Sequence, residues 1–357
     1  MTQWIFIEPN DVWMFRDNKP FTAASDFVAQ SIFPPTPQTV QGAIRTAYLM
    51  QQRLDLQQFM RGKIDDPVIG TPAKLGSLRI QGPYVARRVN GKLERVYPLP
   101  MDVLARKKQT DKQDSNEKEF SVLKPASKSD FKTTPPFEGW RPLTGGGEGF
   151  KEADGFLTEQ GLRDYLAGKA PSADHVVEKE TLYTFEERVG LALDHGRRAN
   201  RQGHFYRAQF VRMQAGAGLL VGLDGGKLNA SGVLQIGGEA RTGCYETVDV
   251  PPLPAARNGA LKVVLLAPAW FEDVYQTDWS PFVGAGRLVS VVLGKPQPIS
   301  GWDVARNQPK PLRNFIPIGS VFHFEGAAWQ GKPFTATPDK DLDFSAMGFG
   351  TCAVGTW

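Results

Sequence analysis

Residues 176–194, VVEKETLYTFEERVGLALD, and residues 203–223, GHFYRAQFVRMQAGAGLLVGL, decide the fold class. Both stretches are rich in aliphatic and aromatic residues and are flanked by turn residues, a pattern that is typical of β-strands. Similar runs follow at 232–238, 260–270, 287–294 and 320–326. Because helical patterns accompany these strands only occasionally, the sequence predicts an α+β fold with antiparallel sheets and helices on one sheet face. A doubly wound nucleotide-binding fold is disfavoured.

The N-terminal half adds a strand and a helix with clear boundary signals. Residues 4–16, WIFIEPNDVWMFR, are predicted to begin as a strand. Thr36 is a suitable N-cap and Pro37 a suitable first helical residue. The apolar residues that follow recur at helical spacing: Val40, Ala43, Ile44, Ala47 and Tyr48. Arg45 lies off this apolar face, so we expect it to point to solvent or to a ligand.

Three local patterns organise the next part of the chain. Asn90–Gly91 stands between two strand-like runs and predicts a hairpin turn. Residues 106–136 have few apolar side chains and charges of both signs, which predicts a mobile, solvated surface insertion. Residues 156–168, FLTEQGLRDYLAG, are typical of a short amphipathic helix that ends at Gly168.

The length of the chain suggests more than one domain. Its 357 residues correspond to about two domains of ordinary size. We place the boundary where the strand-rich region begins. This gives an N-terminal domain over 1–175, which carries the polar insertion, and a C-terminal domain over 176–357, which carries most of the glycine-rich loops.

Composition and charge exclude several classes of protein. The net charge of +4 is small, so a nucleic-acid partner is permitted and depends on whether basic residues cluster. Cys244 and Cys352 form no CxxC pair, which argues against a disulfide scaffold and a cysteine-rich zinc site. No apolar run approaches the roughly 20 residues that span a bilayer, and the N-terminus lacks the features of a signal peptide. We therefore expect a cytoplasmic protein that does not bind membranes.

The glycine-rich stretches do not match a nucleotide-binding motif. None is followed by the Lys-Ser/Thr pair of a P-loop, and the sequence contains no paired-acid metal signature, so we expect neither a cofactor nor a metal ion. Residues 236–241, IGGEAR, are of interest because Arg241 follows Gly237 and Gly238. Such a loop can bring backbone N–H groups close to a phosphate, although glycine-rich turns also occur for purely structural reasons.

The clearest local feature is the basic stretch 195–223. It contains five arginines and no Lys, Asp or Glu: Arg197, Arg198, Arg201, Arg207 and Arg212. The aromatic residues Phe205, Tyr206 and Phe210 stand among them. Guanidinium groups that bind phosphates and aromatic rings that stack on bases are together typical of single-stranded RNA binding. The alternative is a solvated hairpin whose arginines pair with acids elsewhere in the fold.

Two histidines in the same stretch leave an enzymatic alternative open. His195 and His204 could act as general acid and base in a metal-independent ribonuclease. Histidines in a hairpin more often pack or contact RNA than catalyse, so the catalytic interpretation is the minority one. Their spacing also matches no HExxH zinc motif.

Several motifs together resemble one known family. They are DVWMFRDNKPF (11–21), SIFPPTPQTVQGAIRTAYL (31–49), VYPLPMDVL (96–104), ERVGLALDHGRRANRQGHFYRAQFVRM (187–213), LQIGGEAR (234–241), RNFIPIGSVFHFEG (313–326) and GFGTCAVGTW (348–357). In sequence and order these resemble the third subunits of the type III-B CRISPR effector, the Cmr complex, which belong to the RAMP superfamily. The resemblance covers both halves of the chain.

The resemblance implies a fold, a function and partners. The fold is two ferredoxin-like, or RRM-like, domains. The implied function is non-catalytic: the subunit holds the 5′ repeat-derived tag of the guide RNA and docks the large Cas10-type subunit onto the backbone RAMP subunits, in antiviral defence. Target RNA would be contacted only indirectly. The alternative within the RAMP superfamily is an endoribonuclease that processes repeat RNA with His195 and His204.

The resemblance and the basic stretch together give a set of candidate RNA contacts, with no catalytic residue and no metal ligand among them. These are Arg16, Arg45, Arg197, Arg198, Arg201, His204, Arg207, Gly237, Gly238 and Arg241.

Overall fold

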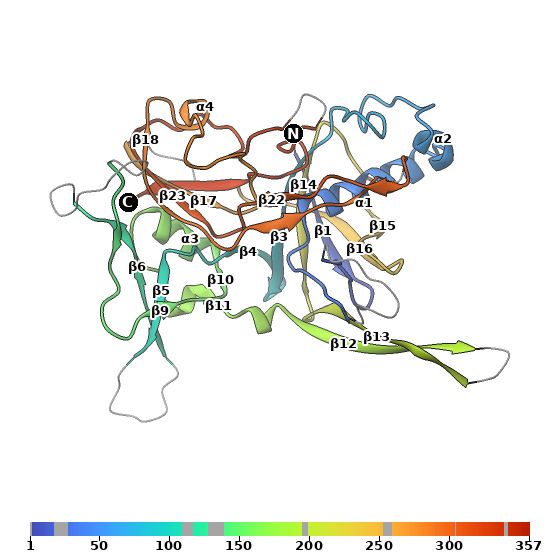
Figure 1. Ribbon diagram of the computed structural model, residues 1–357, viewed down its shortest axis with the longest axis horizontal. Coiled ribbons are helices and arrows are strands. Elements are labelled where there is room, and N and C mark those ends of the chain that lie inside the picture. The colour runs from blue at the N-terminus through green and yellow to red at the C-terminus, as the bar shows by residue number, and fades with distance from the viewer. Residues whose placement is uncertain are drawn as a thin grey trace. The chain divides into compact units, whose positions relative to one another are not determined.

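The computed structural model describes most of the chain, and Figure 1 shows its elements. The described residues are 2–17, 28–108, 117–127, 139–194, 199–252, 259–303, 305–338 and 342–357, with only the backbone described at 28, 191–194 and 199–206. These residues fold into two compact units. The first unit contains Met1–Arg88, Glu180–Asp249 and Pro298–Arg313, and the second contains Val89–Lys179, Val250–Gln297 and Asn314–Trp357.

These units differ from the expected division into 1–175 and 176–357, because each unit is assembled from three separate segments. In the first unit, β1 (Gln3–Pro9) pairs with β14 (Ala217–Asp224) and with β16 (Thr242–Val248). Such long-range strand pairing leaves no trace in local periodicity, which reports only on neighbouring residues.

The first unit is built on an antiparallel sheet with the strand order β3-β14-β1-β16-β15. Among the strands of this unit, β3 (Arg79–Val89) and β15 (Ser231–Gln235) stand at the two ends of that order. The central residues Ile5, Phe6 and Ile7 of β1 are all buried. Both faces of this strand are therefore covered, and hydrophobic burial stabilises the middle of the sheet.

Helix α1 (Pro37–Gln51) confirms the helix predicted after Thr36 and packs against β15. The Thr36 side chain accepts a hydrogen bond from the backbone N–H of Thr39, and Pro37 occupies the first turn. Val40, Ala43, Ile44 and Ala47 are buried, as their spacing predicts. The short helix α2 (Leu56–Met60) follows, capped by Asp55.

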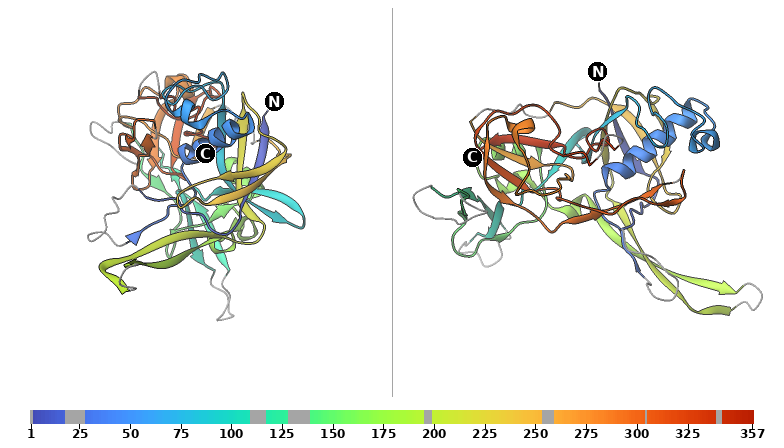
Figure 2. Two further views of the ribbon diagram at one scale, coloured as in Figure 1. Left: turned by 90° about the vertical axis from the view of Figure 1, so that its right-hand side faces the viewer. Right: turned by 45° about the horizontal axis from the view of Figure 1, so that its top comes forward.

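A long antiparallel hairpin of β12 (Tyr183–Asp194) and β13 (Ala199–Met213) belongs to the first unit and confirms the predicted hairpin (Figures 1 and 2). The short strand β2 (Val28–Ala29) pairs with β13 in parallel. The base of the hairpin is anchored by a small buried cluster made of Val12, Met14, Ala29, Ala208 and Phe210. This anchoring fixes the direction in which the neighbouring polar side chains point.

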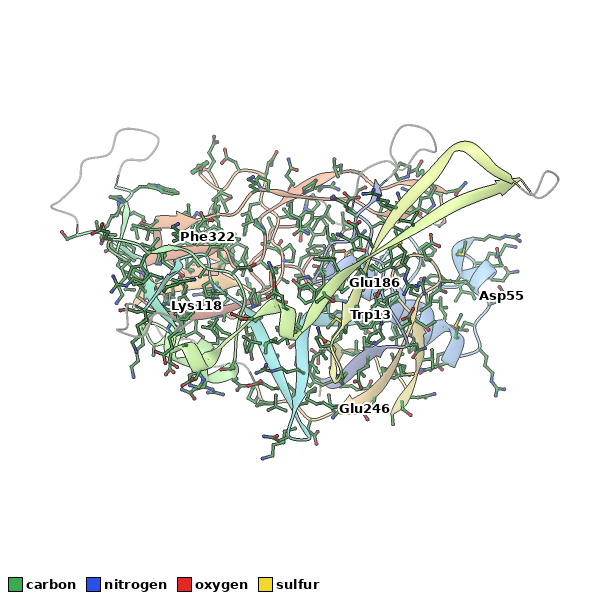
Figure 3. The ribbon with its side chains drawn as sticks, turned by 90° about the horizontal axis from the view of Figure 1, so that it is seen from below. Trp13, Asp55, Lys118, Glu186, Glu246 and Phe322 are labelled. Carbon is green, nitrogen blue, oxygen red and sulfur yellow. The ribbon has the colours of Figure 1, made fainter. Side chains whose placement is uncertain are left out.

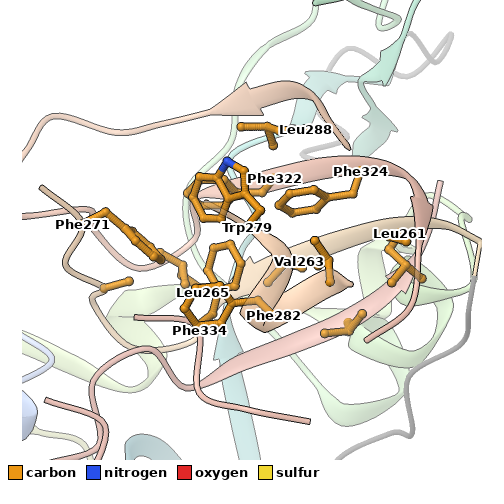
Figure 4. Packing of buried hydrophobic residues seen from close by; sticks show 14 residues of the cluster. Leu261, Val263, Leu265, Phe271, Trp279, Phe282, Leu288, Phe322, Phe324 and Phe334 are labelled. Carbon is orange, nitrogen blue, oxygen red and sulfur yellow. The ribbon is translucent and has the colours of Figure 1, made fainter. Parts of the chain in front are cut away.

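The second unit contains an antiparallel sheet in the order β18-β23-β17-β24. Its strands are β17 (Gly259–Leu265), β18 (Arg287–Val292), β23 (Val321–Ala327) and β24 (Cys352–Thr356), and the short helix α4 (Ser280–Val283) precedes β18. An aromatic core covers one face of this sheet (Figure 4). At its centre, Trp279 stacks on Phe334 with 5.2 Å between ring centroids.

Helix α3 (Glu159–Leu166) also lies in the second unit and packs against β24 and β4 (Lys92–Pro98). Thr158 caps its start, and Gly168 follows its end with a φ of +82°, as predicted for a helix that ends at this glycine. Asn90 and Gly91, between β3 and β4, both have positive φ values, which confirms the predicted hairpin turn.

Part of the polar stretch 106–136 is regular structure rather than loop. Strand β6 (Lys118–Val122) pairs with β5 (Val103–Lys107), which also pairs with β9 (Lys151–Glu152). Strand β7 (Lys124–Pro125) pairs with β8 (Leu143–Thr144). The charged side chains of β5 and β6 form cross-strand ion pairs such as Arg106–Glu119, so the mixed charges stabilise a hairpin here. Residues 109–116 and 128–138 lie outside the described residues.

The remaining elements are short. They are β10 (Phe156–Leu157), β11 (Val176–Val177), two 3₁₀ turns at Ala173–His175 and Lys179–Thr181, β19 (Gln297–Ile299), β20 (Trp302–Asp303), β21 (Gln308–Pro309) and β22 (Arg313–Phe315). The structure therefore confirms an α+β fold with few helices and antiparallel sheets. Within the described residues, no helix is long and apolar enough to cross a membrane.

Candidate nucleic-acid interface

Three arginines of the first unit converge at the base of the β12–β13 hairpin. Arg188 comes from β12, Arg212 from β13 and Arg241 from the turn between β15 and β16. They surround the carboxylates of Asp11, which follows β1, and Glu186, which Figure 3 labels on β12. We call these five side chains the arginine face.

Strand geometry explains why the hairpin residues of the arginine face meet. Glu186 and Arg188 are two positions apart on β12, so both side chains point to the same side. Phe210 lies opposite Glu186, and Arg212 is two positions beyond Phe210. All four side chains therefore lie on one face of the hairpin.

The two carboxylates contact different atoms of the arginines. Glu186 accepts a hydrogen bond from Nε of Arg188 at 2.7 Å and another from Nε of Arg212. Asp11 accepts hydrogen bonds from the Nη2 atoms of the same two arginines, each at 3.2 Å. Nη1 of Arg241 lies 3.6 Å from the Asp11 carboxylate. Each of the two acids is thus shared by at least two arginines.

The aromatic ring of Phe210 contacts two of the guanidinium groups. Arg188 lies 5.0 Å and Arg241 4.8 Å from the centroid of the Phe210 ring, which is within the range of cation–π attraction. Phe210 itself is buried in the cluster at the base of the hairpin. The arginine side chains are 28–44% exposed, so they are oriented by protein contacts and still reach solvent.

The electrostatics of the arginine face keep both acids ionised. Hydrogen bonds from Arg212 and Arg188 lower the pKa of Glu186 to about 2. The hydrogen bond from Arg188, with smaller contributions from Arg212, also lowers the pKa of Asp11 below its ordinary value. At neutral pH, three guanidinium cations and two carboxylates therefore leave a single net positive charge on this surface.

The glycine turn 237–241 lies directly beside the arginine face. Gly237 has a φ of +80°, and a Cβ atom there would collide with the carbonyl oxygen of Met14. The N–H of Gly238 donates to the same carbonyl at 2.7 Å. Gly237 is thus needed for close packing of the turn on Met14, and Gly238 fastens the turn through its backbone N–H.

The next two residues of this turn are exposed. Glu239 and Ala240 both have positive φ values, and their N–H groups donate no hydrogen bond to the residues that the structure describes. Successive N–H groups that face solvent in a turn can bind an anion. The turn therefore presents free backbone donors next to Arg241.

The candidate residues from the sequence other than Arg45 fall into three groups. Arg241 lies on the arginine face, and Gly237 and Gly238 form the turn that positions it. Arg207 is exposed on β13, opposite Val189, and Arg16 is exposed beside Ser31. Arg197 and Arg198 lie outside the described residues, as does His195, and only the backbone is described for Arg201 and His204.

Arg45 differs from the sequence expectation that it points to solvent or to a ligand. Its Nη2 donates to the carbonyl oxygens of Ile69 at 2.8 Å and Thr71 at 2.6 Å. Its guanidinium lies 5.4 Å from the centroid of the Phe59 ring. Arg45 thus holds the loop that follows α2 against α1, because its long side chain bends toward these carbonyl groups.

Four side chains of the arginine face were not among the candidate RNA contacts: Asp11, Glu186, Arg188 and Arg212. The alternation of Glu186 and Arg188 on a predicted strand was a usable signal, because it places opposite charges on one side of the hairpin. The ion pair of Arg212 with Asp11 bears out the alternative that hairpin arginines pair with acids elsewhere in the fold, and Arg212 also pairs with Glu186 on the neighbouring strand.

The family described as CRISPR-associated protein (Cas_Cmr3) matches residues 5–357. The chain belongs to this family. Membership confirms the resemblance to the third subunits of the type III-B Cmr effector that the sequence motifs indicated. No curated protein matches the chain in sequence.

Two solved structures share the fold of this Cas_Cmr3 chain. One is a chain in the type III-B Cmr-beta complex bound to cognate target RNA, with 17% identity and a TM-score of 0.53. The other is a chain of the same complex bound to cognate target RNA and AMPPnP, with 18% identity and a TM-score of 0.52. In both comparisons the match covers 90% of this chain and 86% of the other.

Proposed function

We propose that this protein is a non-catalytic subunit of a type III-B CRISPR effector that binds the guide RNA and holds its 5′ repeat-derived tag. The observation that carries the proposal is the arginine face, where three guanidinium groups from three separate segments converge beside a turn with free N–H donors. Family membership supports the type of complex in which this surface acts.

The chemistry of the arginine face suits single-stranded RNA. Guanidinium groups can each donate two parallel hydrogen bonds to a phosphate, and backbone N–H groups can add further ones. The arginine-rich and aromatic sequence of the hairpin supplies additional phosphate contacts and stacking surfaces. A single net charge at the base of the hairpin limits binding to polyanions in general, so recognition depends on contacts that only the correct RNA can make.

We also propose the partners that the family resemblance implies. The subunit docks the large Cas10-type subunit onto the backbone RAMP subunits and contacts target RNA only indirectly. The structural neighbours from the Cmr-beta complex support an assembly of this kind, since those chains are part of a multi-subunit complex bound to target RNA.

The topology supports two domains of ferredoxin-like origin. In the first unit the strands β1, β3, β14 and β16 lie in the order β16-β1-β14-β3. In the second unit the strands β17, β18, β23 and β24 lie in the order β24-β17-β23-β18. If the four strands of each unit are numbered in chain order, their spatial order across the sheet is therefore 4-1-3-2 in both units. We propose that both are reduced ferredoxin-like domains in which α1 and α4 stand at the first helical connection.

The RNA-binding proposal is tested by the salt dependence of guide-RNA affinity. Arg188→Gln and Arg241→Gln are each expected to weaken binding and to reduce the slope of log affinity against log salt by about 0.7 for each lost phosphate contact. Arg163→Gln is the matched control, because Arg163 forms an exposed ion pair with Glu159 on α3. If both face variants retain the affinity and slope of the control, RNA does not bind this surface.

A separate experiment tests whether the protein cleaves repeat RNA. Purified protein is incubated with repeat RNA in the presence of EDTA. A discrete product with a 2′,3′-cyclic phosphate that disappears in His204→Ala would identify the endoribonuclease alternative. Intact RNA after incubation agrees with a binding subunit.

A further inference from the structure

We propose that the two acids of the arginine face have opposite effects on RNA binding. Glu186 is a positioning residue that fixes Arg188 and Arg212 for RNA, whereas Asp11 occupies the place of a phosphate and competes with RNA for the same guanidinium groups. This inference rests on the proposed function and adds a determinant of specificity to it.

The role of Glu186 follows from the atoms that it contacts. It binds Nε of Arg188 and Nε of Arg212, the guanidinium nitrogens nearest to the aliphatic part of each side chain. A carboxylate bound there fixes the direction of the guanidinium plane and leaves terminal nitrogens available to other groups. The Phe210 ring beneath Arg188 restrains the same plane from another side.

The role of Asp11 follows from its longer and more numerous contacts. Its carboxylate faces the terminal nitrogens of Arg188, Arg212 and Arg241 at 3.2, 3.2 and 3.6 Å. Charge-assisted hydrogen bonds of the strongest kind are shorter, at about 2.7–2.9 Å. The Asp11 side chain is also 48% exposed, so an incoming group can reach the same nitrogens.

A phosphodiester is a suitable replacement for this carboxylate. Both groups carry one negative charge and present two oxygens to guanidinium groups, so a phosphodiester can make the same contacts as the Asp11 carboxylate. Until RNA arrives, Asp11 occupies terminal nitrogens of the three arginines and so limits their binding to other polyanions. Competition from Asp11 thus lowers affinity for all phosphates and leaves discrimination to base contacts.

The test uses two substitutions that change the charge equally. Asp11→Asn and Glu186→Gln each remove one negative charge and keep the side-chain size. The binding of the full chain to a guide RNA with the 5′ tag, and to polyuridylate as a non-cognate probe, is measured by fluorescence anisotropy over a range of salt concentrations. Arg188→Gln and Arg163→Gln are measured alongside.

The two acid variants are expected to move in opposite directions. Asp11→Asn is expected to bind both RNAs about two- to fivefold more tightly, and Glu186→Gln to bind the tagged guide about two- to fivefold more weakly, on the scale of one exposed ion pair. A shift of both variants in the same direction, which net charge alone would produce, overturns the inference. So does unchanged affinity in both. Equal thermal midpoints confirm that both variants are folded.

The arginine variant separates this inference from the proposed function. If Arg188→Gln weakens guide-RNA binding while the acid variants fail to diverge, only the roles of Asp11 and Glu186 are refuted. If neither Arg188→Gln nor the acid variants alter binding relative to Arg163→Gln, the arginine face is not an RNA site and the proposed function loses its main support.

Discussion

Removing the hydroxyl of Tyr165 is expected to destabilise the second unit in a pH-dependent way. Tyr165 is buried on α3, and its hydroxyl donates to both carboxylate oxygens of Asp102, at 2.7 and 2.8 Å. Asp102 is itself buried, and Nε2 of His323 lies 3.7 Å from its Oδ2. Nζ of the buried Lys262 lies 3.5 Å from the centroid of the Tyr165 ring. Tyr165→Phe therefore leaves a buried carboxylate without its main hydrogen-bond donor.

The size of the effect follows from the kind of bond that is lost. Hydrogen bonds to charged groups contribute about 1.5–3 kcal/mol, and the penalty for an unsatisfied buried acceptor is of similar size. We therefore expect Tyr165→Phe to lower the free energy of unfolding by about 2–3 kcal/mol at pH 8. At that pH Asp102 is mostly ionised, because burial raises its pKa only to about 6.

The sign of the pH dependence distinguishes this mechanism from simple loss of packing. A raised carboxyl pKa means that the folded state prefers the protonated form, so ionised Asp102 reduces stability as the pH rises through about 6. The Tyr165 hydroxyl stabilises the ionised form and so opposes this loss. Without it, the pKa of Asp102 rises further, and the variant should be closer to wild-type stability at pH 5 than at pH 8.

The difference in free energy of unfolding between Tyr165→Phe and wild type reports on Asp102 and not on its charged neighbours. Burial lowers the pKa of His323 to about 3 and that of Lys262 to about 8. Lowered pKa values mean that the folded state prefers the neutral forms, so these groups reduce stability when the pH falls below their unfolded values. Both contributions are present in wild type and variant and cancel to first order in the difference.

The assay is urea unfolding at pH 5 and pH 8, followed by circular dichroism, with hydrogen exchange of β17 to locate the loss in the second unit. Tyr275→Phe is the matched control, because Tyr275 is an exposed tyrosine of the same unit. A difference between variant and wild type that is the same at both pH values, or larger at pH 5, would refute this reasoning.

Three further predictions concern the first unit and the hairpin. Gly237→Ala is expected to lower stability by about 1–3 kcal/mol, since a side chain at φ +80° would also collide with Met14; unchanged thermal unfolding would contradict this. Arg45→Gln is expected to destabilise the first unit by about 1–3 kcal/mol through its two lost carbonyl contacts. In the same variant guide-RNA affinity should stay unchanged, and a weaker affinity at equal stability would restore Arg45 as an RNA contact. Changing Arg197, Arg198 and Arg201 together to Ala is expected to weaken assembly on tagged guide RNA and to flatten its salt dependence by about 2 in slope, without loss of folding. A triple variant with wild-type affinity would remove this part of the hairpin from the site.

Features that depend on neighbouring residues could be predicted from the sequence. Helix α1 was predictable because its N-cap Thr36, Pro37 and its apolar spacing all lie within one short stretch. The β12–β13 hairpin was predictable because strand alternation is also a local signal. The assembly of each unit from three segments was not predictable, since it depends on which distant strands pair.

The arginine face could be predicted only in part, because its residues come from segments that are distant in the sequence. Arg212 belongs to the basic stretch and Arg241 was a candidate contact, but local sequence does not show that they meet Asp11, which reaches the site from the end of β1. A missed signal in the second unit was also local: Lys262 and His323 are single polar residues within apolar strand sequences, ALKVVLL and VFHFE. A buried polar residue needs partners, so each of these positions indicated an interior charge cluster.

The charge distribution suggests different roles for two parts of the hairpin. The sequence 195–207 carries four arginines and no acid, whereas the base of the hairpin carries arginines that Asp11 and Glu186 partly neutralise. A local excess of positive charge in the sequence acts over about a Debye length and therefore speeds the approach of RNA, while arginines that are paired with acids act only once a phosphate displaces a carboxylate. A chain with a net charge of only +4 can thus attract RNA at one end of the hairpin and still discriminate at the other, because the step that exchanges Asp11 for a phosphate yields little energy on its own.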